Sequence, residues 1–204
     1  MQSIKNIIFD LGGIFLNINF SKTEQAFAEL GITDFSRYIT QHTITEMFEL
    51  LEIGKISPQE FYQLFRKETG VDITDEQIAN SWNALLLDFP IERLQWLDGI
   101  RKKYKVYLYS NTNKIHYDAF TEIFARQTGL NDFNGYFIKA WYSHELGLRK
   151  PYPSSYLHLL QMEQLNPEET LFIDDTVKNI EGAKEAGLQT IHLVHPETVL
   201  NLDL

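Results

Sequence analysis

Short runs of apolar residues recur along the chain and predict five buried β-strands. These runs cover residues 6–10, 105–110, 136–142, 170–174 and 188–194. Helical patterns separate most of them, and strands that alternate with helices are typical of a mostly parallel sheet covered on both faces. We therefore predict an α/β fold of the doubly wound, Rossmann-like type, in which ligands bind beyond the carboxyl ends of the strands.

The first two strands are separated by a long segment, residues 17–88, that has no convincing strand and many helix-start patterns. Three residue pairs in it fit a capping box, namely Ser21 with Glu24, Ser57 with Glu60, and Thr74 with Gln77. Pro58 suits a first helical position, and Gly31 and Gly70 suit helix ends. We expect a core domain of residues 1–16 and 89–204 and an inserted helical-bundle cap domain of residues 17–88, which would exclude water from a site at the strand ends.

Composition narrows the classes of function. The chain of 204 residues is 44% hydrophobic, enough for a substantial core. A net charge of −10, from 28 acidic and 18 basic residues, disfavours nucleic acid and anionic membranes as partners. No segment approaches the roughly 20 apolar residues of a membrane-spanning helix, and Asp10 interrupts the apolar N-terminal run, unlike a secretory signal. We expect a cytoplasmic protein, and the sequence does not indicate its oligomeric state.

Cysteine is absent from the sequence. This excludes disulfide bonds, thiolate metal sites and cysteine nucleophiles, and it fits a reducing compartment.

The first strand delivers one carboxylate, Asp10, into a turn that contains Gly12 and Gly13. A glycine turn lets the carboxylate project while backbone carbonyl groups face a cation. Asp10 is therefore a candidate nucleophile or metal ligand; the alternative is an Asp that merely caps the turn.

Two later segments suit the binding of phosphate. Ser110, Asn111 and Thr112 end the second strand with a hydroxyl, an amide and backbone N–H groups, although without the other motifs helix capping is the favoured explanation for such residues. Lys150 lies before Pro151, and its charge can neutralise a nucleophile and a phosphate together. An isolated Lys would more simply be a solvated surface residue.

Two adjacent carboxylates, Asp174 and Asp175, follow an apolar run, and Asn179 lies about one helical turn further on. Adjacent carboxylates repel each other, and a divalent cation relieves that repulsion. We favour a metal site over one capping Asp and one surface Asp, because a helix with small residues suited to close packing follows the pair.

In this order, the four segments resemble the haloacid dehalogenase (HAD) superfamily of phosphohydrolases. In that family, a strand-end Asp forms a phosphoaspartate, a Ser or Thr and a Lys hold the phosphate, and an acidic pair binds magnesium. The resemblance implies these roles for Asp10, Ser110, Lys150 and Asp175, together with a Mg²⁺ cofactor and a helical cap of the C1 type.

The resemblance also implies three supporting roles. Asp174 supports the metal shell, the carbonyl group of Gly12 is a metal ligand, and Asn111 contacts phosphate. A small phosphorylated metabolite is the expected partner.

A closer resemblance is to the subgroup that contains bacterial alpha-D-glucose-1-phosphate phosphatase and the N-terminal phosphatase domain of soluble epoxide hydrolase. It is carried by the segments FDLGGIFLNINF, LYSNTN, SHELGLRKP and FIDDTVKNIEGAKEAG. It implies magnesium-dependent hydrolysis of sugar phosphates through an aspartyl phosphate, with glucose 1-phosphate as a candidate substrate.

The chain departs from most phosphatases of the superfamily at Gly12, where they carry an Asp that acts as general acid and base. Such assistance is typically worth about 10² to 10⁴ in rate. Without it, we expect a preference for sugar 1-phosphates or activated phosphates over primary alkyl phosphates, and rates on aryl phosphates should climb steeply with the acidity of the leaving group. A cap carboxylate such as Glu46 is a candidate replacement, although the sequence singles out none.

Two other classes of function stay open. A haloacid dehalogenase uses the same nucleophilic Asp without a metal, but the retained pair Asp174 and Asp175 argues against it. A regulator or pseudo-phosphatase that binds a phosphorylated ligand without turnover is kept open by Gly12. Multiple turnover of a phosphate ester would exclude this second class.

The six histidines show no spacing typical of metal ligands: His42, His116, His144, His158, His192 and His195. We predict that they are surface or capping residues. His144 is the exception, because it lies shortly before Lys150 and is a candidate to reach the substrate.

Overall fold

Five parallel strands form the centre of the structure, a computed structural model that describes residues 3–39 and 44–204. Their order across the sheet is β3-β2-β1-β4-β5, with each neighbouring pair parallel. The strands are β1 (Asn6–Phe9), β2 (Lys105–Ser110), β3 (Lys139–Tyr142), β4 (Thr170–Asp174) and β5 (Gln189–His192). The predicted α/β fold with a parallel sheet is confirmed.

β2 and β4 have the predicted limits, whereas β1, β3 and β5 are shorter than expected. A 3-10 helix, η2 (Asn134–Tyr136), occupies the start of the third predicted strand. Phe137, Leu188 and Leu193 lie outside the strands and are nevertheless buried. An apolar pattern therefore marks burial correctly here but does not show where backbone pairing begins or ends.

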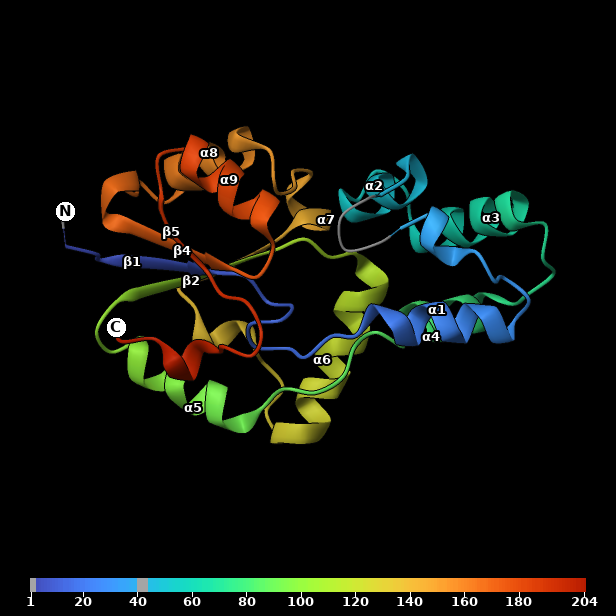
Figure 1. Cartoon of the computed structure of the whole chain (residues 1–204), viewed down its shortest axis with the longest axis horizontal. Coiled ribbons are helices and arrows are strands. Elements are labelled where there is room, and N and C mark those ends of the chain that lie inside the picture. The colour runs from blue at the N-terminus through green and yellow to red at the C-terminus, as the bar shows by residue number, and fades with distance from the viewer. Residues whose placement is uncertain (1–2, 40–43) are drawn as a thin grey trace.

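Helices cover both faces of the sheet (Figure 1). Phe9 and Leu108 point into a core shared with α6, while Ile8 and Tyr109 point into one shared with α8 and α9. Because both faces are buried, the central strands are nearly continuous apolar runs, as parallel sheets require. The helices of this part are α5 (Ile91–Ile100), α6 (Lys114–Thr128), α7 (Ser143–Leu146), α8 (Pro153–Met162), α9 (Val177–Glu185), η3 (Pro167–Glu169) and η4 (Val199–Asn201).

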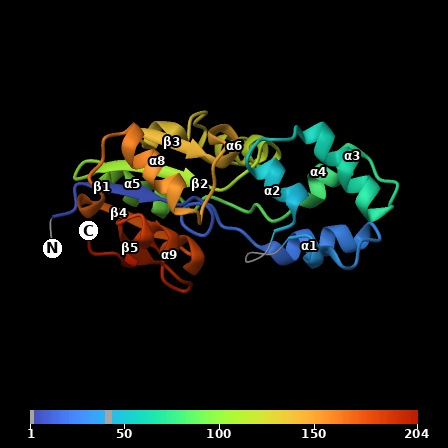
Figure 2. The same ribbon diagram turned by 90° about the horizontal axis from the view of Figure 1, so that it is seen from above.

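A second group of helices lies beyond the carboxyl ends of the strands, as Figures 1 and 2 show from two directions. It comprises α1 (Phe20–Glu29), η1 (Phe35–Arg37), α2 (Glu46–Glu52), α3 (Pro58–Thr69) and α4 (Asp75–Asn83). These helices share an aromatic core of their own, in which Phe48 contacts Phe61 and Trp82 with ring centroids 5.0 and 5.1 Å apart. Ring pairs at this separation add to the stability that burial provides.

Local capping sets the starts of these helices. The capping boxes at Ser57 and Thr74 form as predicted, and Gly70 ends α3 in a left-handed conformation. The capping box predicted at Ser21 is wrong, because Asn19 caps α1 and accepts a hydrogen bond from the N–H of Ser21. Two good cap residues lie two positions apart there, and the upstream one is used.

The two chain crossings between the sheet and the second group of helices lie side by side. The N–H of Asn17 donates to the carbonyl of Asp88 (2.8 Å), and the N–H of Leu87 donates to the carbonyl of Asn17 (3.0 Å). A short antiparallel bridge between Ile18 and Leu86 continues this pairing. Within residues 3–39 and 44–204, no helix combines the length and apolar character needed to cross a bilayer.

Candidate active site

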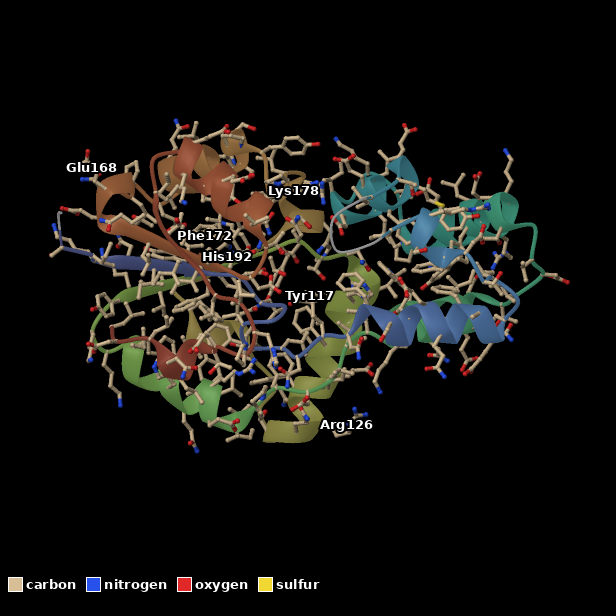
Figure 3. The ribbon with its side chains drawn as sticks, viewed as in Figure 1. Tyr117, Arg126, Glu168, Phe172, Lys178 and His192 are labelled. Atoms are coloured by element: carbon tan, nitrogen blue, oxygen red, sulfur yellow. The ribbon has the colours of Figure 1, made fainter. Side chains whose placement is uncertain are left out.

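Polar residues gather where the three central strands end. Asp10 follows β1, Ser110 is the last residue of β2, and Asp174 is the last residue of β4. Since β1 pairs with both β2 and β4, their carboxyl ends meet at one edge of the sheet. Figure 3 shows Lys178 on α9 and Tyr117 on α6 on the same side, toward the second group of helices.

Lys150 joins two of the strand ends. Its Nζ lies 2.7 Å from Asp10 Oδ1 and 2.7 Å from Asp174 Oδ2, and the side chain is buried. Burial alone would lower the pKa of Lys150, but the attraction of the two carboxylates outweighs it and raises the pKa. The ammonium therefore stays charged, and removing it would leave buried carboxylates uncompensated at a cost of about 3–5 kcal/mol.

The carboxylates of Asp10, Asp174 and Asp175 form a cluster in which one oxygen from each lies within 4.8 Å of the others. Burial raises the pKa of Asp10 to about 7, with Lys150 opposing the shift and the neighbouring carboxylates adding to it. Burial and the charge of Asp174 raise the pKa of Asp175 to about 6. The three carboxylates repel one another, and their hard oxygen atoms are the ligands that a divalent cation such as Mg²⁺ prefers, so the cluster fits such a cation.

Asp174 and Asp175 differ in their surroundings. Asp174 accepts hydrogen bonds from Asn179 Nδ2 at both oxygens (3.1 and 3.0 Å) and from the N–H of Thr176 (2.8 Å), in addition to its bond with Lys150. It is fully buried, whereas Asp175 lines the cavity described below. The contacts of Asp174 fix its orientation and leave Asp175 as the carboxylate of the pair that faces the cavity.

The turn after Asp10 depends on its two glycines. Gly13 has φ +73, and a Cβ there would lie 2.5 Å from Asp175 Oδ2, so only glycine allows this close approach. At Gly12, a Cβ would lie 3.1 Å from Cδ1 of Ile18. The space beside Gly12 is therefore partly taken by an apolar side chain.

The segment after β2 holds Lys150 in place. Asn111 Nδ2 donates to the carbonyl of Lys150, and the N–H of Lys150 donates to Asn111 Oδ1, both at 2.9 Å. The N–H of Thr112 donates to Ser143 Oγ (2.9 Å), which in turn donates to the carbonyl of Thr112. The side-chain amide of Asn111 is thus engaged with the backbone, and Ser110 lines the cavity with its Oγ making a long hydrogen bond (3.5 Å) to the carbonyl of Asn111.

A cavity of about 360 Å³ opens between these strand ends and the second group of helices. The sheet side contributes Asp10, Gly12, Ser110, Asn111, Lys150 and Asp175, and the helical side contributes Ile18, Phe20, Ile39, Ile44 and Glu52. A smaller recess of about 100 Å³ shares Gly12 and Ser110 and extends to Trp82 and His116. Volumes of this size accommodate small metabolites.

Contacts between the two parts of the molecule close one side of the cavity. Arg149 Nε lies 3.0 Å from Glu52 Oε2, and Arg149 also pairs with Glu49 at 3.6 Å. Gly54 packs so closely on α7 that a Cβ would lie 2.1 Å from the carbonyl oxygen of His144. The end of α2 is therefore held against the segment that carries Lys150.

The prediction that the histidines lie at the surface or at helix caps is wrong for His116. It is buried, its Nδ1 lies 2.8 Å from Asn83 Oδ1, and its ring centroid is 4.4 Å from that of Trp82. Burial lowers its pKa to about 3. His144 lines neither cavity, and His42 lies outside the described residues.

Several cavity residues went unrecognised in the sequence. The sequence marks Glu52 only weakly, by its position just before the turn that starts at Gly54. It marks Arg149 only by its position beside Lys150. Glu46, the cap carboxylate considered there, is exposed and lines neither cavity. The pairing of Arg149 with Glu52 spans 97 positions of sequence, which no local pattern reports.

The family of this chain follows from sequence comparison. Residues 4–187 match the haloacid dehalogenase-like hydrolases. The chain belongs to this family. Among curated relatives of this HAD-type hydrolase, a D-ribitol-5-phosphate phosphatase of Bacteroides thetaiotaomicron is 35% identical over 189 residues, covering 92% of this chain and 90% of the relative. A sesquiterpene phosphatase of Aspergillus oryzae is 28% identical over 193 residues, covering 94% and 90%.

Solved structures agree with this assignment. A HAD-family enzyme from Bacteroides thetaiotaomicron, an Asp-to-Ala mutant in complex with magnesium and inorganic phosphate, has a TM-score of 0.89 at 32% identity and covers 96% of each chain. A 2-haloacid dehalogenase from Pseudomonas syringae shares the fold at a TM-score of 0.56 and 18% identity, covering 93% of this chain and 86% of that one. The family, the fold and the phosphatase relatives support a hydrolase that acts on phosphoric monoesters, while the resemblance to glucose-1-phosphate phosphatase stays a prediction.

Proposed function

We propose that this HAD-type hydrolase is a magnesium-dependent phosphatase of small polyhydroxylated phosphate esters, acting through an aspartyl phosphate on Asp10. The observation that carries the proposal is the buried Lys150, paired at 2.7 Å with Asp10 inside a cluster of three carboxylates at the strand ends. A carboxylate nucleophile, a fixed cation and a divalent metal site are the parts that phosphoryl transfer from a monoester needs.

In this mechanism, an oxygen of Asp10 attacks phosphorus in line with the departing alcohol. Ser110 Oγ and the backbone N–H of Asn111 hold phosphoryl oxygens, and Lys150 offsets the charge of nucleophile and phosphate. Asp10, Asp175 and the carbonyl of Gly12 would hold Mg²⁺, with Asp174 as support. The metal would supply electrostatic stabilisation of the phosphoryl charge.

The recess beside the phosphate site supports a hydroxylated substrate. If Nδ1–H of His116 donates to Asn83, Nε2 is an acceptor, because the low pKa keeps the ring neutral. Nε1 of Trp82 is buried and has no hydrogen-bond partner among the described residues. The recess is also lined by Glu52, Ser110, Asn111 and Thr112, and polar groups of this kind among apolar side chains suit the hydroxyl groups of a sugar or sugar alcohol.

The substrate class extends beyond sugar 1-phosphates. The substrate in the name of the Bacteroides relative, ribitol 5-phosphate, is the ester of a primary alcohol. We therefore include both sugar-alcohol phosphates and glucose 1-phosphate as candidates. We also propose that residues 17–88 form a cap on a core of residues 1–16 and 89–204, supported by the paired crossings at Asn17 and Asp88.

The test is release of inorganic phosphate from ribitol 5-phosphate, glucose 1-phosphate and related esters, with Mg²⁺ and with EDTA. We expect multiple turnovers with Mg²⁺ only, and a loss of roughly 10³-fold or more in Asp10→Asn, because the nucleophile is removed. Activity of Asp10→Asn near that of the wild type would overturn the role of Asp10.

Two further outcomes separate the alternatives. Halide release from 2-chloropropionate without metal would indicate a dehalogenase, whose likeness to this chain lies in the fold alone. Tight binding of phosphate esters without turnover would indicate a pseudo-phosphatase.

A further inference from the structure

The position that would hold the general acid contains Gly12, and the side chain of Ile18 lies 3.1 Å from where a Cβ would be. No carboxylate can reach the leaving alcohol from there. An alkoxide is a poor leaving group, and proton transfer by a placed side chain is typically worth about 10² to 10⁴ in rate. A phosphatase of alkyl esters built on this turn needs a proton donor from elsewhere.

Three carboxylates line the two cavities among the described residues: Asp10, Asp175 and Glu52. Asp10 is the proposed nucleophile, and Asp175 belongs to the acidic cluster. His116 lines the recess too, but with its pKa lowered to about 3 the ring is neutral near pH 7 and lacks the second proton that an acid catalyst would donate. Glu52 is the carboxylate that lines both cavities and has no other assigned role.

The contacts of Glu52 leave one of its oxygens available. Oε2 is held by Arg149 Nε at 3.0 Å, whereas Oε1 has no hydrogen-bond partner among the described residues, and Glu52 lines both cavities. The side chain is only 14% exposed. A largely buried carboxyl group in the cavity wall, with one oxygen fixed and the other unpaired, has the geometry of a positioned acid and base.

The charges around Glu52 are balanced. Burial raises its pKa, Arg149 opposes the shift, Glu49 adds to it and Lys150 opposes it. Burial is the largest of these influences, so the proton is held more firmly than by a free Glu. Perturbed carboxyl groups of this kind, held in a cleft beside a specific charge partner, are typical of functional sites.

We propose that Glu52 is the proton donor and acceptor of the reaction, reaching the site from the end of α2. This rests on the proposed phosphatase function. In the first step, an oxygen of Asp10 bonds to phosphorus, the bond from phosphorus to the ester oxygen breaks, and that oxygen takes the proton of Glu52. In the second step, Glu52 takes a proton from water, the water oxygen bonds to phosphorus, and Asp10 leaves as a carboxylate with release of inorganic phosphate.

This role changes the dependence on the leaving group. Gly12 alone predicts that rates climb steeply with the acidity of the alcohol. With Glu52 as donor, the wild type depends only weakly on that acidity, and the steep dependence belongs to a variant without the acid. Arg149 acts as a positioning residue that keeps Glu52 Oε2 in place.

The experiment compares Glu52→Gln with the wild type on ribitol 5-phosphate and on aryl phosphates of graded leaving-group acidity. We expect kcat to fall about 10² to 10⁴-fold on the alkyl ester, but less than about 10-fold on 4-nitrophenyl phosphate, which leaves without a proton. Equal losses on both substrates would overturn the proposal. So would a steep plot for the wild type, a measurement that needs no variant to fold.

Glu49→Gln is the matched control. Glu49 lies on the same helix and contacts the same Arg149, and its Oε1 is 3.3 Å from the Tyr152 hydroxyl, but it lines neither cavity. The Glu49→Gln substitution should weaken the contact of α2 with the core without changing how the rate depends on the acidity of the leaving group. A wild type that turns over no phosphate ester would instead count against the proposed function.

Discussion

At the scale of single residues, burial places His116 where a charge would be costly. Its imidazole sits between α4 and α6, against Trp82 and beside Asn83. With no carboxylate to stabilise an imidazolium, burial alone lowers its pKa to about 3. The folded protein therefore binds the proton of this residue less tightly than the unfolded chain does.

This shift predicts a loss of stability in acid. Between pH 6.5 and about 3 the unfolded state holds more protons at His116, so the free energy of unfolding falls as pH falls below 6.5. From pH 7.5 to 5.5, the wild type should lose about 1.4 kcal/mol more than His116→Gln does. Urea denaturation of both proteins at the two pH values measures this difference.

The exposed His158 gives the control for this measurement. His158→Gln should lose as much stability as the wild type between the two pH values. A wild type and His116→Gln with the same pH dependence would contradict the assigned burial of a neutral ring.

At the scale of elements, the turn between α2 and α3 connects the two parts of the molecule. Gly54 has φ +65 and meets the carbonyl of His144 at the start of α7, while Glu52, two residues earlier, pairs with Arg149. The position of this turn therefore fixes the position of Glu52 in the cavity. Catalysis should respond when the turn is moved, even by a residue that touches no substrate.

Gly54→Ala should reduce kcat/KM for the phosphate ester by about 10 to 100-fold, because misplacement by about 1 Å is that costly. Gly70→Ala is the control, since Gly70 also has positive φ but a Cβ there would meet nothing within 4 Å. Gly70→Ala should lose about 1–2 kcal/mol of stability from the left-handed conformation alone. Gly54→Ala should lose more, because its Cβ would also clash with the carbonyl oxygen of His144 at 2.1 Å. Equal kcat/KM values in the two variants would show that the contact with α7 does not position the site.

The limits of the elements also show how much of the secondary structure is determined by local sequence. The limits of β2 and β4 were predictable because both strands are buried and end in polar residues. The capping boxes at Ser57 and Thr74 were also predictable, because all their hydrogen-bond partners lie within three residues of sequence. The edge strands β3 and β5 were overestimated. Buried side chains beside them, such as Leu193, follow the same pattern without backbone pairing.

The candidate site likewise contains residues that local sequence identifies and residues that it does not. Asp10, Ser110 and Asp174 were recognisable because they end buried strands, and parallel strands bring such ends together. Glu52 and His116 were not, since their places depend on packing between segments 97 and 33 positions apart. The positions of the strand-end residues can be predicted from the sequence here, and the contacts that bring Glu52 and His116 to the cavities cannot.

At the scale of the whole molecule, a net charge of −10 surrounds a site proposed for anionic substrates. Lys150 alone does not neutralise three clustered carboxylates, so a bound cation should stabilise the folded protein. The pKa values of Asp10 and Asp175, raised to about 7 and about 6, set the pH range in which the cation binds. At a pH below these pKa values, the carboxyl groups must lose their protons before they can bind a metal.

Excess Mg²⁺ should therefore raise the melting temperature at pH 7.5 and much less at pH 5.5, where binding is roughly 10-fold weaker or more. At a concentration 100 times Kd, the added stability is about 2.7 kcal/mol. Thermal unfolding with Mg²⁺ or EDTA measures the effect, and Asp175→Asn should abolish most of it. A larger effect at pH 5.5 would contradict the metal assignment.

The hydrogen bonds between Asn17 and both Asp88 and Leu87 have one more consequence. The polypeptide departs from the sheet and returns to it at adjoining points, so the intervening 70 or so residues impose no separation on the strands they interrupt. Any module whose two ends adjoin could be spliced there without rethreading the sheet. Exchange of this module would replace the helical wall of the cavity together with Glu52, while Asp10, Ser110 and Lys150 would stay with the part of the chain that builds the sheet.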